Sequence, residues 1–127
     1  MVFDASALLA YLRDEPGSDV VARRFGADAG ISAVNMSEVL ARLHRDGAPQ
    51  AEVRRLETDS PLVVFPFGLE TASVAAELIR STQALGLSLG DRCCLATAIM
   101  RDEEVLTGDR AWERLPQDLS RRVVLIR

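Results

Sequence analysis

The chain has 127 residues, 48% of them hydrophobic and 27% charged, and its formal net charge is −4. This balance predicts one soluble globular domain spanning residues 1–127, argues against intrinsic disorder, and leaves no apolar run near the roughly 20 residues that a membrane helix needs. The acidity also argues against a broad nucleic-acid surface, so a nucleic-acid substrate would require a small contact area, bound cations or a partner protein.

The chain opens on a short apolar run, Met1 to Phe3, which ends at Asp4 and is expected to form a buried strand. Because Asp4 interrupts this run, we expect no secretory leader, and the simplest expectation is a cytoplasmic protein. Helices are expected next over 6–13, where leucines recur at helical spacing, and over 18–25, after a turn that contains proline and glycine.

The rest of the chain alternates between short apolar runs and helical patterns. Strands are expected at 30–33, 62–65, 104–107 and 123–126. Helices are expected at 35–44, 49–57, 70–85, 88–101 and 109–114. Because the apolar runs are continuous rather than alternating, the strands should be parallel and covered on both faces. With right-handed crossovers, this pattern predicts an α/β fold, a three-layer α/β/α sandwich around a central parallel sheet of about five strands.

Four carboxylates stand where an apolar run would pass into a helix, and they are Asp4, Glu38, Asp91 and Asp109. In an open parallel sheet such positions converge on one edge, which is where α/β proteins bind ligands. Carboxylates crowded at that edge would raise one another's pKa and destabilise the fold unless a divalent cation lay among them. The four acids therefore predict a metal site.

Each acid also has a purely structural explanation. Two of them complete segments that have the form of a helix capping box, Asn35-x-x-Glu38 and Ser88-x-x-Asp91. The other two could each cap the helix that follows them, and such a cap contributes about 1 kcal/mol. Independent caps need not share one edge of a sheet, but for any single acid both explanations stay open.

The chain offers oxygen ligands and no zinc site. Its two cysteines, Cys93 and Cys94, are adjacent, so they neither form an ordinary disulfide nor belong to a C-x-x-C motif, and we expect them in the core. The single histidine, His44, is expected at the end of a helix, away from the acids. A carboxylate-only set suits Mg²⁺ or Mn²⁺.

Four segments carry a family resemblance, and they are Val2–Leu8, Asn35–Val39, Leu87–Arg92 and Leu106–Asp109. In this order and spacing, over essentially the whole chain, they resemble PIN-domain proteins, specifically VapC-type toxin ribonucleases of type II toxin–antitoxin systems. The resemblance implies a PIN-like nuclease domain that cleaves RNA phosphodiester bonds with Mg²⁺ or Mn²⁺. By this resemblance, the acidic site residues of the family correspond to Asp4, Glu38, Asp91 and Asp109, and Ser6 and Thr107 correspond to positions that support the site.

On this resemblance we hypothesise that Asp4 and Asp91 are the main metal ligands. Glu38 would act through a metal-bound water, and Asp109 would complete the site or hold a second ion. The resemblance also implies a homodimer and a cognate small antitoxin, which would bind a groove on the early helices. The apolar residues proposed for that groove, all of which could instead be core, are Leu8, Leu9, Leu12, Val20 and Val21.

Other protein classes fit less well. A haloacid-dehalogenase phosphatase needs a second Asp two positions after Asp4 and a Lys, but Ser6 occupies that position and the chain has no Lys. A receiver-like domain also needs a late Lys. A catalytically silent PIN-like binding module stays open as the alternative function. Arg13 and Arg92 could contact phosphates, although salt bridges or solvent would explain them equally well.

Overall fold

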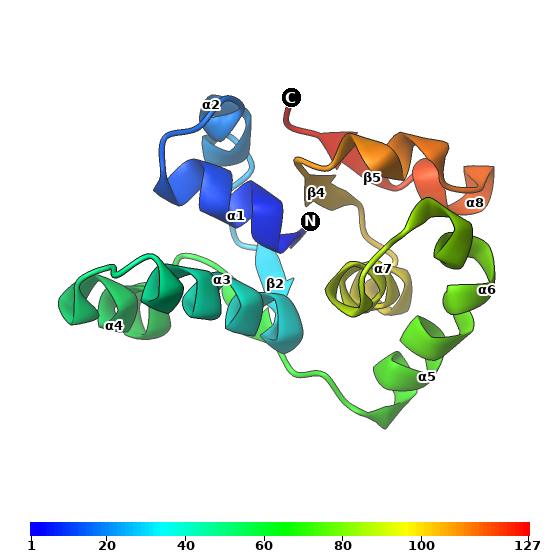
Figure 1. Ribbon diagram of the computed structural model, residues 1–127, viewed down its shortest axis with the longest axis horizontal. Coiled ribbons are helices and arrows are strands. Elements are labelled where there is room, and N and C mark those ends of the chain that lie inside the picture. Colours follow the sequence, from blue (N-terminus) through cyan, green and yellow to red (C-terminus); the bar gives the residue numbers. More distant parts are fainter.

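The computed structural model describes all 127 residues (Figure 1). Five parallel strands form one sheet in the order β3-β2-β1-β4-β5. The strands are β1 (Val2–Phe3), β2 (Gly30–Ser32), β3 (Val63–Phe65), β4 (Val105–Thr107) and β5 (Val123–Leu125). β1 lies at the centre of the sheet, where Val2 is opposite Gly30 on one side and Val105 on the other. The predicted parallel sheet of five strands is confirmed.

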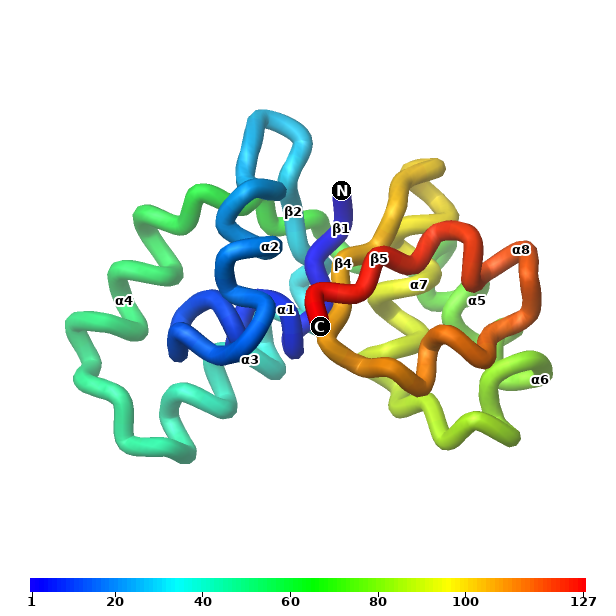
Figure 2. Tube along the Cα trace, turned by 90° about the horizontal axis from the view of Figure 1, so that it is seen from above, coloured from blue at the N-terminus to red at the C-terminus, as the bar shows by residue number.

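Helices cover both faces of the sheet, which is therefore the middle of three layers (Figure 2). One face carries α1 (Ala5–Leu12), α2 (Ser18–Ala22), α3 (Ala33–Arg45) and α4 (Gln50–Asp59). The other carries α5 (Leu69–Glu77), α6 (Ile79–Thr82), η1 (Gln83–Leu85), α7 (Leu89–Arg101), η2 (Arg110–Arg114) and α8 (Gln117–Ser120). None of these helices combines the length and the apolar character needed to cross a membrane.

Neighbouring residues of the central strands point into opposite layers. Phe3 and Leu106 pack under α1 to α4, whereas Val2 and Val105 pack under the helices of the other face. All four side chains are fully buried, so both faces of each strand require an apolar residue, and this requirement explains the continuous apolar runs. Cys93 and Cys94 are also buried and unpaired, as expected.

Several helix boundaries differ from the expected ones. The helix expected over 70–85 is divided into α5, α6 and η1, and one break falls at Thr82, whose Oγ1 donates to the carbonyl of Leu78 at 2.7 Å. Gly86 ends this segment in the left-handed conformation, with φ of 70°. α2 ends at Ala22, three residues before the expected end. The four-residue α8 was not predicted because so short a helix carries no recognisable apolar pattern.

The carboxyl ends of the central strands meet at one edge of the sheet. β1 leads into α1 through Asp4, β4 leads into η2 through Asp109, and β2 leads into α3, which carries Glu38. Asp91 differs from the expectation, because it follows η1 and not a strand. It lies in the first turn of α7, which packs on β1 and β2 and leads back to β4. A helix that returns to the start of a parallel strand begins at the carboxyl edge, so Asp91 still lies there.

Candidate functional site

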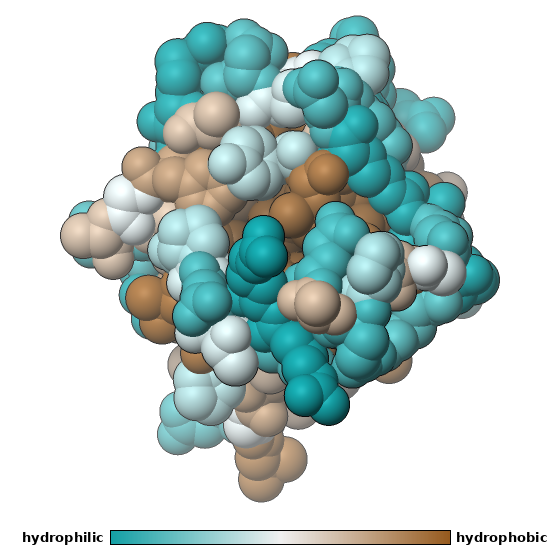
Figure 3. All heavy atoms as spheres, turned by 90° about the vertical axis from the view of Figure 1, so that its left-hand side faces the viewer, coloured by the Kyte–Doolittle hydropathy of each residue, from teal (hydrophilic) through white to brown (hydrophobic).

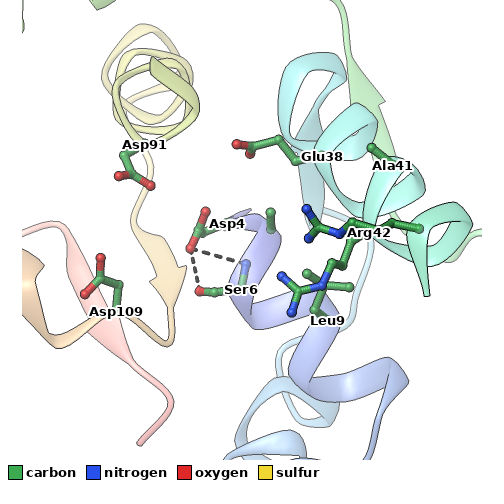
Figure 4. Close-up of a pocket in the computed structure, with 10 residues that line it drawn as sticks. Asp4, Ser6, Leu9, Glu38, Ala41, Arg42, Asp91 and Asp109 are labelled. Carbon is green, nitrogen blue, oxygen red and sulfur yellow. Dashed lines mark hydrogen bonds between the residues drawn. The ribbon is translucent and has the colours of Figure 1, made fainter. Parts of the chain in front are cut away.

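The four predicted acids line a single cavity of about 440 Å³ at this edge of the sheet (Figure 4). In the close-up, the carboxylates of Asp4, Glu38, Asp91 and Asp109 point into the space between α1, α3, α7 and β4. Ser6 also lines the cavity. The structure thus brings together side chains from four separate segments of the chain, as the parallel topology predicted.

Asp4 is the most buried of these acids, with 4% of its surface exposed. Its Oδ2 accepts hydrogen bonds from Ser6 Oγ at 2.5 Å and from Thr107 Oγ1 at 2.9 Å, and its Oδ1 accepts no side-chain hydrogen bond. Burial raises the pKa of Asp4 to about 6, and the nearby charge of Asp91 adds to the rise, while the two hydroxyl groups oppose it. No basic side chain pairs with this carboxylate. Ser6 and Thr107 thus hold Asp4 directly.

Ser6 and Thr107 also connect Asp4 to the end of β4. Ser6 Oγ accepts from the backbone amide of Gly108 at 2.9 Å, and Thr107 Oγ1 accepts from the backbone amide of Asp109 at 3.1 Å. Five hydrogen-bonding groups, from the start of α1 and from the end of β4 and the two residues after it, therefore form one network. The position of the Asp4 carboxylate is set by that network and not by α1 alone.

Glu38 is held by a residue that the sequence analysis assigned to a different role. Ser32, not Asn35, caps α3, so the capping box expected at Asn35-x-x-Glu38 is wrong. The side chain of Asn35 is fully buried; its Oδ1 accepts from Ser32 Oγ at 2.5 Å, and its Nδ2 donates to Glu38 Oε2 at 2.8 Å and to the carbonyl of Gly90 at 3.0 Å. A second capping pattern three residues earlier, Ser32-x-x-Asn35, is the signal in the sequence that would have shown that Ser32 is the cap and that Asn35 is free to orient Glu38.

The remaining two acids are helix caps as well as cavity residues. Asp91 and Ser88 form the predicted capping box, with Asp91 Oδ2 accepting from the Ser88 backbone amide at 2.7 Å. Asp109 caps η2, and its Oδ1 accepts from the backbone amide of Ala111 at 2.9 Å. Each cap occupies one carboxylate oxygen, and the other oxygen of each acid accepts no hydrogen bond. Capping and cavity lining are therefore compatible for both acids.

The donor chemistry of the cavity suits a hard divalent cation, although the carboxylates do not form a complete ligand shell. No three side chains among the His, Cys, Asp and Glu residues come close enough to hold one ion together. The carboxylates stay apart because each is fixed by its own hydrogen bonds and because their negative charges repel one another. Mg²⁺ typically keeps several waters and takes one or two carboxylates directly, so a pair of these acids suffices. Asp4 is a candidate for such a pair, because it is buried without a basic partner and lies near enough to Asp91 for that charge to raise its pKa.

Two arginines that the sequence analysis did not single out also line the cavity, Arg42 and Arg45. They follow Glu38 at spacings of four and seven residues, which places all three on one face of α3. Of the arginines weighed above, Arg13 pairs with Asp46, and Arg92 donates to the carbonyl of Leu87 at 3.1 Å. Neither of them lines the cavity.

The model of the PIN domain family matches residues 1–117. The chain therefore belongs to the PIN-domain family, and the resemblance noted in the sequence is confirmed at that level. A comparison with curated protein sequences found no match.

Solved structures with the same fold include two toxin–antitoxin assemblies. A toxin–antitoxin complex from Klebsiella pneumoniae aligns with a TM-score of 0.76 and 18% identity, covering 99% of this chain and 97% of that one. DNA-bound VapBC from Salmonella typhimurium aligns with a TM-score of 0.77 and 17% identity over the same shares of the two chains. FitAcB from Neisseria gonorrhoeae aligns with a TM-score of 0.68 and 21% identity, covering 87% of this chain and 88% of that one. At these identities the likeness establishes the fold.

Proposed function

We propose that the chain is a metal-dependent endoribonuclease of the VapC type, the toxin of a toxin–antitoxin pair, acting as a single PIN domain in the cytoplasm. The observation that carries the proposal is the cavity in which a buried, unpaired Asp4 faces Glu38, Asp91 and Asp109. Membership of the PIN family supports nuclease chemistry, and the structural likeness to toxin–antitoxin complexes supports the toxin assignment.

In this proposal Asp4 and Asp91 hold a Mg²⁺ or Mn²⁺ ion, with Asp109 completing the site or holding a second ion. Such a cation polarises a phosphoryl oxygen and lowers the pKa of a bound water. Glu38, oriented by Asn35, accepts the proton of the water that attacks phosphorus. The bond between phosphorus and the 3′ oxygen then breaks, and that oxygen takes up a proton from solvent. Ser6 and Thr107 keep Asp4 in position throughout.

The test is cleavage of total cellular RNA by the purified chain with Mg²⁺ or Mn²⁺, compared with EDTA and with Asp4→Asn. Asp118→Asn is the matched control, because Asp118 is an exposed acid on α8, away from the cavity. Wild type and the control should give discrete fragments that vanish with EDTA and in Asp4→Asn. Absence of products from folded, metal-supplied and partner-free wild type would refute the proposal and favour a catalytically silent PIN-like binding module.

We also propose that a small antitoxin binds the outer face of α1 to α4. Leu12 and Tyr11 are 37% and 41% exposed there, and a hollow of about 270 Å³ lies between Leu12 and Leu56. Figure 3 shows hydrophobic atoms gathered in a hollow on this side of the molecule, bordered by hydrophilic ones. Of the residues assigned to this groove, however, Leu8 and Val21 are core. Leu12→Glu should therefore weaken capture of the antitoxin, whereas unchanged capture would contradict this location.

The homodimer implied by the resemblance would use the opposite layer. Leu89 and Ile79 are 64% and 39% exposed, and both line a largely apolar hollow of about 340 Å³ beside α5 and α7. Burying such side chains between two copies would be favourable. Light scattering after size exclusion should give a dimer mass for wild type and a monomer mass for Ile79→Glu. A monomeric wild type would contradict the dimer.

A further inference from the structure

We propose that Arg42 and Arg45 bind backbone phosphates of the RNA next to the one that is cleaved, an inference that rests on the proposed ribonuclease function. Both residues line the cavity that holds the four acids. Figure 4 shows Arg42 on the side of the cavity formed by α3. Ala41, which has a short side chain, lies on the same face of α3 and also lines the cavity.

The spacing along α3 suits an extended strand. At a rise of 1.5 Å per residue, Arg42 lies about 6 Å and Arg45 about 10 Å from Glu38 along the helix axis. The helix therefore presents one carboxylate followed by two cationic groups in a line that leads away from the acid cluster. An RNA strand with its scissile phosphate among the acids would place its neighbouring phosphates against this line.

A simpler explanation would be that these arginines only offset the charge of the acids, and the contacts argue against it. Neither guanidinium forms an ion pair with any of the four cavity acids. Arg42 instead contacts Asp46, which does not line the cavity, at 3.3 Å, and Asp46 also pairs with Arg13. Arg45 forms no ion pair. Both arginines therefore keep hydrogen-bond donors free of ion pairs at a cavity that, in the proposed function, admits a phosphodiester.

Guanidinium groups match the geometry of phosphate because their donors form a planar fork that binds two oxygens at once. The arrangement also suits the overall charge of the chain, which is −4 and provides no broad basic surface. Two arginines beside the metal ligands supply cationic contacts only where the strand passes the site. The predicted small contact area thus corresponds to this one face of α3.

The experiment measures RNA binding and RNA cleavage separately on the full chain. Binding is followed by the fluorescence anisotropy of a labelled single-stranded RNA of mixed sequence with Ca²⁺, with the integrity of the RNA checked on a gel, over a range of salt concentrations. Cleavage rates with Mn²⁺ give kcat and KM. The variants are Arg42→Gln, Arg45→Gln, their combination and the conservative Arg42→Lys. Arg54→Gln is the control, because Arg54 is exposed on α4 and lies outside the cavity.

Each Gln variant should raise the Kd and the KM about 3- to 10-fold, the loss of about one phosphate contact, while kcat stays within about twofold. The slope of log K against log salt should fall by about 0.7 for each arginine removed. Arg42→Lys should recover part of the affinity, and Arg54→Gln should match wild type. Circular dichroism of every variant checks that the fold is retained.

A wild-type Kd and salt slope in the double variant would overturn the inference and leave the ribonuclease proposal standing, with an acidic protein segment as the remaining ligand class for these arginines. Weakened RNA binding in the double variant, together with no cleavage by wild type, would show that the two arginines bind RNA phosphates, but it would refute the ribonuclease proposal and with it their placement next to a cleaved phosphate. Failure of wild type to bind the RNA would overturn the inference.

Discussion

Asn35 donates from a single amide nitrogen to Glu38 Oε2 at 2.8 Å and to the carbonyl of Gly90 at 3.0 Å. One buried side chain therefore joins α3 to α7 where Glu38 and Asp91 face each other. Its third partner, Ser32, is the last residue of β2 and caps the N-terminus of α3. The conformation of Glu38 thus depends on a residue that does not itself line the cavity.

Asn35→Ala removes all three of these side-chain hydrogen bonds, to Glu38, to the Gly90 carbonyl and from Ser32. We expect kcat to fall about 10-fold or more, because partners that orient site residues typically contribute 10–100-fold. The free energy of unfolding should fall by about 1–3 kcal/mol. Steady-state kinetics and urea unfolding measure the two effects. In combination with Glu38→Ala the losses in kcat should be less than additive, and full additivity would show that Asn35 acts independently of Glu38.

Gly90→Ala should separate activity from stability. A Cβ added at Gly90 would lie 2.1 Å from Glu38 Oε1, so the carboxylate must move. Moving Glu38 breaks its hydrogen bond from Asn35, which typically contributes about 1 kcal/mol. Alanine favours a helix by about 1 kcal/mol over glycine, so the two effects should nearly cancel and the free energy of unfolding should change by less than about 1 kcal/mol. Cleavage should fall about 10-fold or more, because the acid is displaced by more than the tolerance of a positioned site.

The control for that substitution is Gly26→Ala, since a Cβ at Gly26 would meet nothing within 4 Å. It should leave the cleavage rate unchanged. Wild-type cleavage by folded Gly90→Ala would mean that the observed position of Glu38 is not the one used in the reaction. Thermal unfolding by circular dichroism accompanies both rate measurements.

The raised pKa of Asp4 predicts how stability depends on pH. Its pKa is about 6 in the folded chain against an ordinary value of 3.8, so the folded state holds this proton more tightly than the unfolded state does. The resulting stabilisation is fully present below about pH 4 and is lost as the pH rises through about 6, a change of about 3 kcal/mol. Asp4→Asn carries no titrating group here and should lack that loss.

Urea unfolding of wild type and Asp4→Asn in EDTA, at several values between pH 4 and 7, measures this difference. The other titrating groups are common to both proteins, so subtracting one curve from the other isolates Asp4. The free energy of unfolding of wild type should fall relative to the variant as the pH rises. Parallel curves would contradict the assignment of a raised pKa to this residue.

Binding of a cation should restore the stability that the fold loses when Asp4 ionises. At pH 7.5, where Asp4 is ionised, Mn²⁺ or Mg²⁺ at about 100 times its Kd should stabilise the fold by about 2.7 kcal/mol. At pH 5 the effect should be much smaller, because a proton then occupies Asp4 and competes with the metal. Thermal unfolding with and without metal measures it, with Asp118→Asn as the control. An equal metal-induced shift in Asp4→Asn would place the ion elsewhere.

The strands and two of the acids were predictable because each depends on a local pattern. The runs that became β1 and β4 are buried on both faces, so their composition is apolar throughout, and an acid directly after such a run can only lie at the sheet edge. This reasoning placed Asp4 and Asp109 correctly. Asp91 was placed correctly for a partly wrong reason, since it follows a 3₁₀ segment and reaches the edge through the direction of α7.

The contacts of Asn35 and the arginines were harder to predict. Ser32-x-x-Asn35 and Asn35-x-x-Glu38 are overlapping patterns of the same form, and only the location of the first helical turn distinguishes them. Arg42 and Arg45 lie on a helix face whose charged residues would ordinarily face solvent. Whether such a face borders a cavity depends on how α3 packs against α1 and α7, and a single sequence does not contain that information.

The network that joins Ser6, Asp4 and Thr107 also has a consequence for synthesis of the chain. The residues that hold Asp4 are about a hundred positions apart, and β1 lies between β2 and β4 in the sheet. While a ribosome is still translating the first two-thirds of the chain, β4 has not been synthesised, so its place beside β1 in the sheet is empty and neither Thr107 nor Asp109 exists. A chain that ends before Thr107 therefore cannot assemble this acidic cluster, so the site forms only after most of the chain has been synthesised.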